Sequence, residues 1–206
     1  MAGQPLSPPE KVRVSKALSY LLRHGAEKQG IPIGSDGFIK LTDILLRRNF
    51  SGVTPEHVCY VVANCEKQRF TLREDSSGEL WIRANQGHSM HVEHLELTPI
   101  TDPTGIIAVH GTTRVAWENI KDRGLSRMQR QHVHFACGLP GSGQVISGMR
   151  ASCEVHIYLD VATFLADGGT LVRSTNGVLL SPGDAQGLIP PKYFASVTDE
   201  KGLSLR

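Results

Sequence analysis

Apolar residues in the first part of the chain recur at helical spacing. One stripe occupies positions i, i+3, i+4 and i+7: Val14, Ala17, Leu18 and Leu21. This stripe predicts a helix that begins after Ser7, where Ser7 and Glu10 stand in capping-box register, and that runs to about His24. Gly25 follows at the position where a left-handed C-cap is expected. The pattern therefore predicts one amphipathic helix with Arg23 and His24 in its last turn.

Two further helices and a hairpin are predicted in the same part of the chain. Thr42 is expected to cap a short helix ahead of the apolar residues 44–46, and Thr54 with Pro55 is expected to begin another. Apolar residues then alternate on both sides of a polar turn at residues 74–78, which predicts a β-hairpin. Three helices followed by a hairpin are typical of a winged helix.

The second part of the chain predicts a different arrangement. Helix-breaking residues gather at 96–105, so we place a linker there and expect two domains, residues 1–98 and 99–206. Apolar runs predict strands near residues 106–109, 133–136, 154–160 and 170–173. Helical spacing predicts helices near residues 115–121 and 161–166. Asn176 and Gly177 are expected to close a hairpin in which both central residues take positive φ, so this part is predicted to be α+β with a mixed sheet.

The composition is that of an ordinary globular protein, with 40% hydrophobic and 20% charged residues among 206. A formal net charge of +2 is too small for the whole protein to attract a polyanion, so any contact with nucleic acid has to depend on a local cluster of arginines. The cysteines form no CxxC pair, the N-terminus has no signal-type apolar run, and no window approaches about 18 consecutive apolar residues. We therefore expect a reduced intracellular protein, in the cytoplasm, the nucleus or both, without a membrane span.

Four arginines are candidates for binding a phosphate group: Arg23, Arg69, Arg83 and Arg130. The planar guanidinium group forms two parallel charge-assisted hydrogen bonds with phosphate oxygens and keeps its proton. For Arg23 and His24 an alternative is a pair of cations that stabilises a helix C-terminus. Arg69 is equally compatible with a solvated surface charge.

A second candidate site is the run VHGT, residues 109–112, which lies at the end of an expected strand and before an expected helix. Backbone N–H groups and Gly111 at such a position would let a nucleotide approach closely. The alternative is a turn with an N-capping threonine. The segment by itself does not decide between the two.

Three other patterns do not predict a site. His88, His91 and His94 lack the cysteines or the helical H-x3-H spacing of a zinc site, so no metal is expected. The glycine-rich residues 138–144 resemble a P-loop, but Gln144 stands where a phosphate-binding lysine is required. Because no G-x-G-x-x-G motif follows an expected strand, a dinucleotide held in the Rossmann manner is not expected either.

Six segments, in order along the chain, closely resemble the KptA-type RNA 2′-phosphotransferases: LSYLLRHG (18–25), KQRF (67–70), IRANQGHS (82–89), VHGT (109–112), RQHVHFA (130–136) and NGV (176–178). Together they span nearly the whole chain, and six ordered motifs are far more specific than any one alone. The resemblance implies an N-terminal winged-helix lobe that binds an RNA 2′-phosphate and a C-terminal ADP-ribosyltransferase-like lobe that holds NAD⁺. NAD⁺ is then a co-substrate that the reaction consumes, and no metal is implied.

The same resemblance implies roles for individual residues. The catalytic residues are Arg23, His24, Arg69 and Arg130. The residues expected to bind NAD⁺ are His110, Gly111, Thr112, His134, Asn176 and Gly177. The residues expected at the substrate phosphate or the RNA are Arg83, Gln86, His88 and Ser89. Arg127 lies close to Arg130 in sequence and is the alternative to it; Arg130 is preferred for its distance from HVHF.

The activity implied is removal of an internal 2′-phosphate from RNA, with tRNA as the favoured substrate. The reaction would pass through an ADP-ribosylated RNA phosphate and give 2′-OH RNA, nicotinamide and ADP-ribose 1″,2″-cyclic phosphate. No catalytic glutamate stands beside residues 176–178, which suits a phosphate nucleophile that needs no activating base. A monomer is expected by default.

Three rival functions stay open on the sequence. A two-histidine RNA phosphoesterase needs two facing H-x-S/T motifs, and we find one, at His110. A DNA-binding winged helix joined to a ligand sensor needs a basic recognition helix, whereas residues 55–66 carry Glu56 and Glu66 and no lysine before Lys67. Within the resembling family, transfer of ADP-ribose to terminal phosphates of RNA or DNA is the third.

Overall fold

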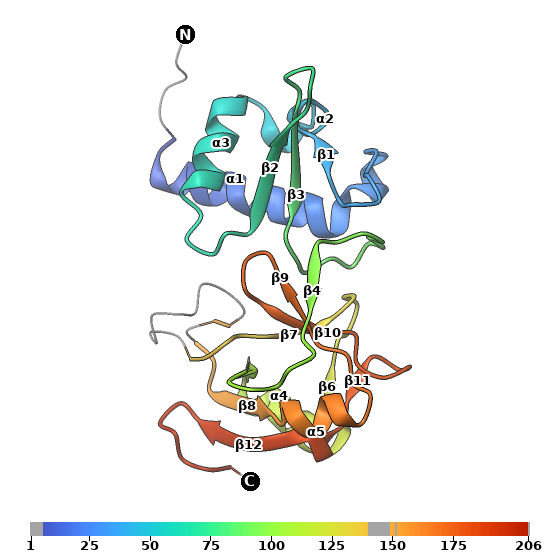
Figure 1. Ribbon diagram of the computed structural model, residues 1–206. Helices are drawn as coiled ribbons and strands as arrows, with labels where there is room; N and C mark the ends of the chain where they lie inside the picture. The colour runs from blue at the N-terminus through green and yellow to red at the C-terminus, as the bar shows by residue number, and fades with distance from the viewer. Residues whose placement is uncertain (1–5, 140–148, 151, 206) are drawn as a thin grey trace. The chain divides into compact units, whose positions relative to one another are not determined.

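The computed structural model of the protein describes residues 6–139, 149–150 and 152–205. The glycine-rich residues 140–144, which gave the P-loop-like pattern, lie outside the described residues. The chain divides into two compact units, Met1–Glu96 and Leu97–Arg206. The fold is a mixture of helices and several antiparallel sheets, and the expected α+β class is confirmed at that level (Figure 1).

Unit 1 consists of helices packed on a small antiparallel sheet. Its elements are α1 (Pro8–Tyr20), a π-helical turn (Leu21–Gly25), a 3-10 turn (Glu27–Gln29), β1 (Ile39–Lys40), α2 (Leu41–Leu45), a 3-10 turn (Arg48–Phe50), α3 (Pro55–Ala63), β2 (Phe70–Glu74) and β3 (Leu80–Ala84). The strand order is β1-β3-β2, with Leu72 opposite Ile82. Figure 1 shows β2 and β3 running side by side in this unit. The apolar face of the sheet and the apolar stripes of the helices form one buried core, so the predicted period of two in the hairpin is confirmed.

The starts of two helices follow from their caps. The Glu10 carboxylate accepts a hydrogen bond from the backbone N–H of Ser7 at 2.9 Å, which completes the predicted capping box. Thr54 caps α3 by accepting a hydrogen bond from the backbone N–H of His57. α2 differs from the prediction: it begins at Leu41, because the chain passes from β1 into the helix without a loop, and Thr42 is therefore not the N-cap.

The end of α1 also differs from the prediction. Instead of ending at a left-handed glycine, the helix widens into the π-helical turn Leu21–Gly25. The glycine with positive φ comes later, at Gly30 (φ 63). A Cβ at Gly25 would lie 2.9 Å from Cε1 of Tyr20, so glycine is needed there to make room for the tyrosine ring. The π-helical turn places Tyr20 and Gly25 against each other.

Unit 2 consists mainly of short strands, and every strand pair among its described residues is antiparallel, so the predicted mixed sheet is wrong. Its elements are β4 (Leu97–Pro99), β5 (Val109–Thr112), α4 (Arg114–Arg123), β6 (Leu125–Ser126), β7 (Val133–Phe135), β8 (Val155–Leu159), α5 (Val161–Ala166), β9 (Val172–Ser174), β10 (Leu179–Ser181), β11 (Leu188–Ile189), a 3-10 turn (Pro191–Tyr193) and β12 (Phe194–Asp199). The sheets have the orders β4-β9-β10-β7, β12-β8-β5 and β11-β6. A pair of backbone hydrogen bonds between Val109 and Ala136, at 2.9 and 2.8 Å, joins β5 to the end of β7. The two larger sheets therefore meet at the VHGT strand.

The β9–β10 hairpin exists as predicted, but its turn is of another type. Gly177 has positive φ (79) and Asn176 does not. The backbone N–H of Gly177 donates to the carbonyl of Ser174 at 2.9 Å, and the Ser174 hydroxyl accepts from the N–H of Val178 at 3.1 Å. The buried serine thus holds a turn in which a single left-handed glycine is sufficient. None of the helices in the described ranges has the length and hydrophobicity of a membrane-spanning segment.

Candidate functional site

In unit 1 one loop connects the segments that carry the first three predicted catalytic residues. This loop, residues 85–90, directly follows β3, and its side chains are buried apart from Ser89. The N–H of Asn85 donates to the carbonyl of Arg69 at 2.9 Å, and the N–H of Ser89 donates to the carbonyl of Arg23 at 2.9 Å. Arg23 and Arg69 are distant in sequence, and the backbone of each is hydrogen-bonded to this loop. The structure therefore brings the two arginines to the same part of unit 1.

Asn85 anchors the loop beside Arg69. Its amide is buried, donates to the carbonyl of Gln68 at 2.8 Å and accepts from the hydroxyl of Thr71 at 2.6 Å. Gln68 has a positive φ of 43, a backbone conformation that a side chain disfavours and that needs external support. Asn85 belongs to the IRANQGHS motif, but the sequence alone predicts no role for it. A buried asparagine is recognisable only once its partners on the neighbouring turn and strand are known.

His24 is oriented by the other end of the loop. Its Nδ1 atom lies 2.8 Å from Oγ of Ser89, and its ring lies 6.2 Å, centroid to centroid, from that of Tyr20. A histidine whose Nδ1 is fixed by a hydrogen bond has a defined ring orientation, with Nε2 set on the opposite side. His24 and Arg23 are both half-buried and lie in the π-helical turn, a helix irregularity that is common at functional sites.

The guanidinium groups of Arg23 and Arg69 lie in different local surroundings. A Cβ at Gly87 would be 3.3 Å from Nε and 3.5 Å from Cζ of Arg23, so the guanidinium lies along the backbone of the loop at a glycine whose φ is 91. Nη1 of Arg69 lies 3.5 Å from Sγ of Cys65. Both side chains are half-buried. Guanidinium and imidazole groups are side chains that suit the oxygens of a phosphate group.

The four residues expected at the RNA differ in accessibility. Arg83, Gln86 and His88 are 4%, 7% and 1% exposed, whereas Ser89 is exposed. The guanidinium group of Arg83 pairs with Glu96 at 2.5 Å and lies 4.8 Å from the ring centre of Phe38. Three of the four side chains are therefore buried in the structure. Ser89 is the accessible member of the set.

In unit 2 the predicted NAD-binding histidine is fixed on β5. Nδ1 of His110 lies 2.9 Å from the carbonyl oxygen of His134, so Nδ1 carries the hydrogen and Nε2 is left as an acceptor. Burial lowers the pKa of His110, the positive charge of Arg130 lowers it further, and the hydrogen bond to His134 acts in the opposite direction. The net lowering keeps the imidazole neutral at pH 7. A neutral ring with an accepting Nε2 suits a hydroxyl donor such as a ribose hydroxyl.

Gly111, the next residue on β5, lies under two sulfur-containing side chains. A Cβ there would be 2.4 Å from Sδ of Met149 and 2.7 Å from Sγ of Cys153, so any larger residue requires these side chains or the strand to move. Thr112 ends the strand, and Thr113 caps α4 by accepting from the N–H of Ala116 at 3.2 Å. The N-capping threonine considered from sequence is therefore present, one residue after VHGT. It does not conflict with a ligand at His110 or Gly111.

Arg127 and Arg130 have different environments. Nη1 of Arg127 donates to the carbonyl of Arg130 at 2.6 Å, and a Cβ at Gly187 would lie 2.4 Å from Nε of Arg127. The guanidinium group of Arg127 thus packs against the protein backbone. Arg130 is more exposed than Arg127. Partial desolvation of its guanidinium group nevertheless lowers its pKa, and the positive charge of Arg150 lowers it further. Arg130 also lowers the pKa of His110, so its positive charge lies near that ring.

Asn176 and Gly177 lie near the end of β7. The Asn176 side chain is 2% exposed, and its Oδ1 accepts from the hydroxyl of Ser174 at 2.8 Å. Sγ of Cys137 donates to the carbonyl of Gly177 at 2.9 Å, which ties the hairpin turn to the chain just after β7. His134 on β7 lies opposite Leu180 on β10. The predicted NAD-binding residues of unit 2 are therefore carried by strands that are hydrogen-bonded neighbours.

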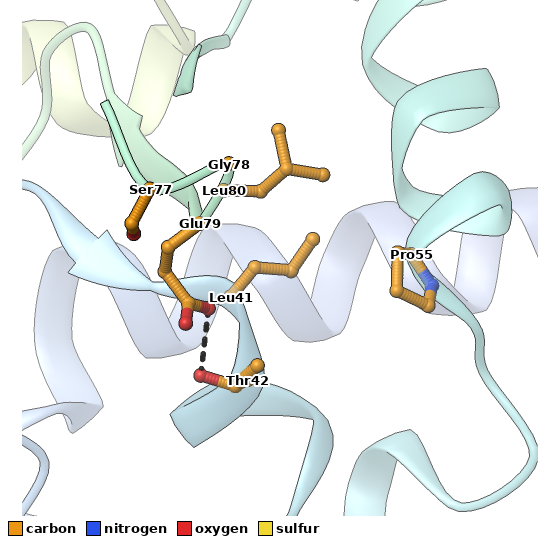
Figure 2. Close-up of a pocket in the computed structure, with 7 residues that line it drawn as sticks. All are labelled: Leu41, Thr42, Pro55, Ser77, Gly78, Glu79 and Leu80. Atoms are coloured by element: carbon orange, nitrogen blue, oxygen red, sulfur yellow. Dashed lines mark hydrogen bonds between the residues drawn. The ribbon is translucent and has the colours of Figure 1, made fainter. Parts of the chain in front are cut away.

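A pocket of about 410 Å³ occupies another part of unit 1. Figure 2 shows that it is lined by the turn between β2 and β3, the start of α2 and Pro55, with the hydroxyl of Thr42 donating to the Glu79 carboxylate at 3.0 Å. None of the catalytic or binding residues predicted from sequence lines this pocket. Within the described part of the chain, no cluster of three or more histidine, cysteine or acidic side chains is arranged to hold a metal ion.

Comparison with known proteins agrees with the resemblance noted in the motifs. Residues 9–183 match the family described as RNA 2′-phosphotransferase, Tpt1/KptA family. The chain is 48% identical over 196 residues to a tRNA 2′-phosphotransferase 1 of Danio rerio, covering 93% of this chain and 87% of that protein. It is 47% identical over 196 residues to the protein of the same name from Homo sapiens (94% and 78% covered) and 36% identical over 179 residues to the tRNA 2′-phosphotransferase of Saccharomyces cerevisiae (82% and 78% covered). The chain belongs to the Tpt1/KptA family of RNA 2′-phosphotransferases.

Proposed function

We propose that this protein removes an internal 2′-phosphate from RNA by transferring it to the ADP-ribose part of NAD⁺, which is consumed as a co-substrate. The observation that carries the proposal is the convergence of Arg23, His24 and Arg69 on the loop at residues 85–90 of unit 1. Arginine forks are suited to a phosphate with free oxygens because each forms two charge-assisted hydrogen bonds. In this proposal unit 1 acts as a winged-helix lobe that binds the 2′-phosphate.

Unit 2 is proposed to be the ADP-ribosyltransferase-like lobe that binds NAD⁺. The neutral His110, with Nδ1 bonded to the carbonyl of His134, is assigned to a hydroxyl of the nicotinamide ribose. Gly111 keeps the backbone of β5 close to its neighbours, and Asn176 with Gly177 contributes from the hairpin between β9 and β10. The donor and acceptor chemistry of these groups fits a nucleotide, and no metal is required.

In the first step an oxygen of the RNA 2′-phosphate attacks C1″ of the nicotinamide ribose. The bond from C1″ to the nicotinamide nitrogen breaks, and nicotinamide leaves with the bonding electron pair. The phosphate is already an anion, so no side chain has to remove a proton from it. Arg23 and Arg69 hold the phosphate and set its direction of attack. Such positioning lowers the activation free energy of enzyme reactions by roughly several kcal/mol.

In the second step the 2″-hydroxyl of the transferred ribose attacks the phosphorus atom. The bond from phosphorus to the RNA 2′-oxygen breaks, the 2″-hydroxyl loses its proton, and the RNA oxygen gains one. The products are 2′-OH RNA and ADP-ribose 1″,2″-cyclic phosphate. We assign stabilisation of the charge on the phosphoryl oxygens to Arg130, and proton transfer or hydrogen bonding to His24.

The favoured substrate is tRNA, because the relatives that cover most of this chain are named tRNA 2′-phosphotransferases. The test uses an RNA oligonucleotide with one internal 2′-phosphate, incubated with and without NAD⁺. We expect 2′-OH RNA and the cyclic ADP-ribose phosphate only when NAD⁺ is present. RNA cleavage or phosphate release without NAD⁺ contradicts the proposal and favours a phosphoesterase.

A control separates the two steps of the proposed reaction. The same RNA with a terminal phosphate instead of the internal one can accept ADP-ribose but offers no 2′-phosphate for the second step. An ADP-ribosylated product from that RNA, together with no release from the internal substrate, limits the activity to ADP-ribosylation. Release of 2′-OH RNA from the internal substrate supports the full reaction.

A further inference from the structure

We propose that Tyr20 is a stacking surface for a nucleobase of the RNA, next to the nucleotide whose phosphate is bound by Arg23 and His24. The inference rests on the proposed function, because it needs the RNA phosphate at these two residues. It adds a recognition element for the base, whereas the site described above binds only the phosphate. Aromatic side chains are the usual partners of unstacked bases in proteins that bind single-stranded RNA.

The position of the Tyr20 ring is fixed by the helix that carries it. Tyr20 is the last residue of α1, and the π-helical turn that follows brings Gly25 against the ring, with a hypothetical Cβ at Gly25 only 2.9 Å from Cε1 of Tyr20. Gly25 therefore packs close to one edge of the ring. A ring held in one orientation can stack on a base with little loss of side-chain entropy.

The same ring is open to solvent. Tyr20 is 53% exposed, the largest exposed fraction of any phenylalanine, tryptophan or tyrosine that the structure describes. Tyrosine is intermediate between buried and exposed residue types in globular proteins, so exposure makes the ring available for stacking, and its place beside His24 is what points to a role. Here the helix presents the ring outward although its neighbour Leu18 is completely buried. A solvent-accessible ring that packs on the helix along one edge leaves aromatic surface available for stacking on a base.

The ring also lies beside the proposed phosphate-binding residues. Its centroid is 6.2 Å from that of His24, at an interplanar angle of 54°. A phosphate on the 2′-oxygen is separated from the base of its own nucleotide by only the ribose ring. When His24 contacts that phosphate, the bases of the same and the adjacent nucleotides come within reach of Tyr20. Lys16, exposed one turn earlier on α1, supplies a positive charge for a flanking backbone phosphate.

The first part of the test compares Tyr20→Leu, Tyr20→Phe and the control Val12→Ala by steady-state kinetics on a 2′-phosphorylated RNA. Leucine keeps apolar bulk beside Gly25 without an aromatic face, and Val12 is a 52% exposed apolar residue earlier on α1. We expect Tyr20→Leu to raise KM for RNA about tenfold with kcat changed by less than about twofold, since stacking is present before and during the chemical steps. Tyr20→Phe should restore most of the affinity. Equal KM values for wild type, Tyr20→Leu and Val12→Ala overturn the inference.

The second part places an abasic nucleotide at the 2′-phosphorylated position, or at either neighbour, in three separate RNAs. One of the three should raise KM of the wild-type protein about tenfold, and the same RNA should cause no further loss in Tyr20→Leu, because the stacking partner is already missing. If, at all three positions, the abasic RNA raises KM by the same factor in Tyr20→Leu as in the wild type, stacking on Tyr20 is contradicted. If Tyr20→Leu does not fold, the wild-type abasic series still decides: no effect at any position overturns the inference. Failure of the proposed function is distinguished by the wild-type protein failing to release 2′-phosphate from the intact RNA.

Discussion

Nδ1 of His24 lies 2.8 Å from the hydroxyl oxygen of Ser89, although the two residues are 65 positions apart in the sequence. The backbone N–H of Ser89 meanwhile donates to the carbonyl of Arg23 at 2.9 Å. One residue of the loop therefore fixes both the histidine ring and the backbone of the adjacent arginine. In the proposed reaction this makes Ser89 a positioning residue, which acts on the phosphate through its neighbours.

Replacing Ser89 by alanine should lower activity more than stability. The alanine keeps the backbone hydrogen bond to Arg23 but removes the hydroxyl that orients His24. A positioned general acid or base contributes roughly 10²- to 10⁴-fold to a rate, and we expect loss of orientation to lower kcat by about tenfold. The change is measured as kcat and KM on 2′-phosphorylated RNA, and Ser89→Thr should recover much of kcat. Ser77→Ala, in the exposed turn before β3, is the matched control, and equal kcat values for the two alanine variants contradict the prediction.

Arg130→Ala should separate the two steps of the proposed reaction. Without this guanidinium group the second step loses a stabiliser of phosphoryl charge and should slow by about 10²- to 10³-fold, so that ADP-ribosylated RNA accumulates. Arg23→Ala and Arg69→Ala should instead slow both steps, because both residues hold the phosphate. Labelled RNA followed on a gel over time gives the ratio of intermediate to product. Arg123→Ala, at the exposed end of α4, serves as the control, and equal slowing of both steps in Arg130→Ala rules out the division of labour.

The sequence predicts best those elements that their own residues determine. The capping box at Ser7 and the Thr54-Pro55 start of α3 are local, and both are present. The hairpin of β2 and β3 is also predictable, because its alternating pattern permits only one register with the core. Such features follow from side-chain period and capping chemistry without knowledge of the rest of the fold.

Features that depend on distant partners were not predictable in this way. Gly25 looks like a helix C-cap in sequence, but the ring of Tyr20 occupies the adjacent space and the helix continues as a π-helical turn. Asn85 supports the backbone at Gln68 through contacts that no local pattern indicates. β12 (Phe194–Asp199) pairs with β8 and was not anticipated, because its apolar positions are interrupted by polar ones and by an irregular register. The resemblance to a family supplied the site residues, whereas the structure showed which of them are accessible.

Arg83 and Glu96 should respond unequally to substitution. Arg83 is 4% exposed and its Nε has no hydrogen-bond partner, whereas the Glu96 side chain is 71% exposed. Glu96→Gln leaves a buried charge without its counter-ion and should cost about 1–2 kcal/mol, a value reduced by solvent screening at Glu96. Arg83→Met removes the charge itself and should cost less. Chemical denaturation gives both values, and a larger loss in Arg83→Met contradicts the prediction.

The same Arg83 variant tests the expected contact with RNA. If the buried side chain only supports unit 1, KM for 2′-phosphorylated RNA should rise by less than about twofold in Arg83→Met. A tenfold rise in KM, which corresponds to about 1.4 kcal/mol of lost binding, would instead place Arg83 in contact with the RNA.

Gly111→Ala should destabilise unit 2 and weaken NAD⁺ binding together. The added Cβ would lie 2.4 Å from Sδ of Met149, so the methionine or strand β5 has to move, at a cost of about 1–3 kcal/mol. Shortening the neighbour in the double variant Gly111→Ala with Met149→Ala should restore part of the loss, because the clash with Met149 is then removed and only that with Cys153 is left. Thermal unfolding and NAD⁺ titration by calorimetry provide the two measurements. Additive losses in the double variant contradict the proposed contact.

His110 should make the stability of unit 2 depend on pH. Burial, aided by the charge of Arg130, lowers its pKa below the ordinary value of about 6.5, so below that pH the unfolded chain binds a proton that the folded chain does not. The free energy of unfolding should therefore fall as pH decreases from about 6.5 through the folded-state pKa, and it should be fully retained above pH 6.5. His110→Gln, which keeps a hydrogen-bond donor toward the carbonyl of His134, should reduce this fall. The measurement is urea unfolding followed by tryptophan fluorescence in a Trp81→Phe background, so that the signal comes from Trp117 in unit 2. His132, whose pKa is lowered by burial and by Arg127, provides the comparison, because His132→Gln should remove a separate part of the dependence of unfolding free energy on pH. If His110→Gln leaves that dependence unchanged, the folded protein binds a proton at His110 as readily as the unfolded chain, and the prediction is wrong.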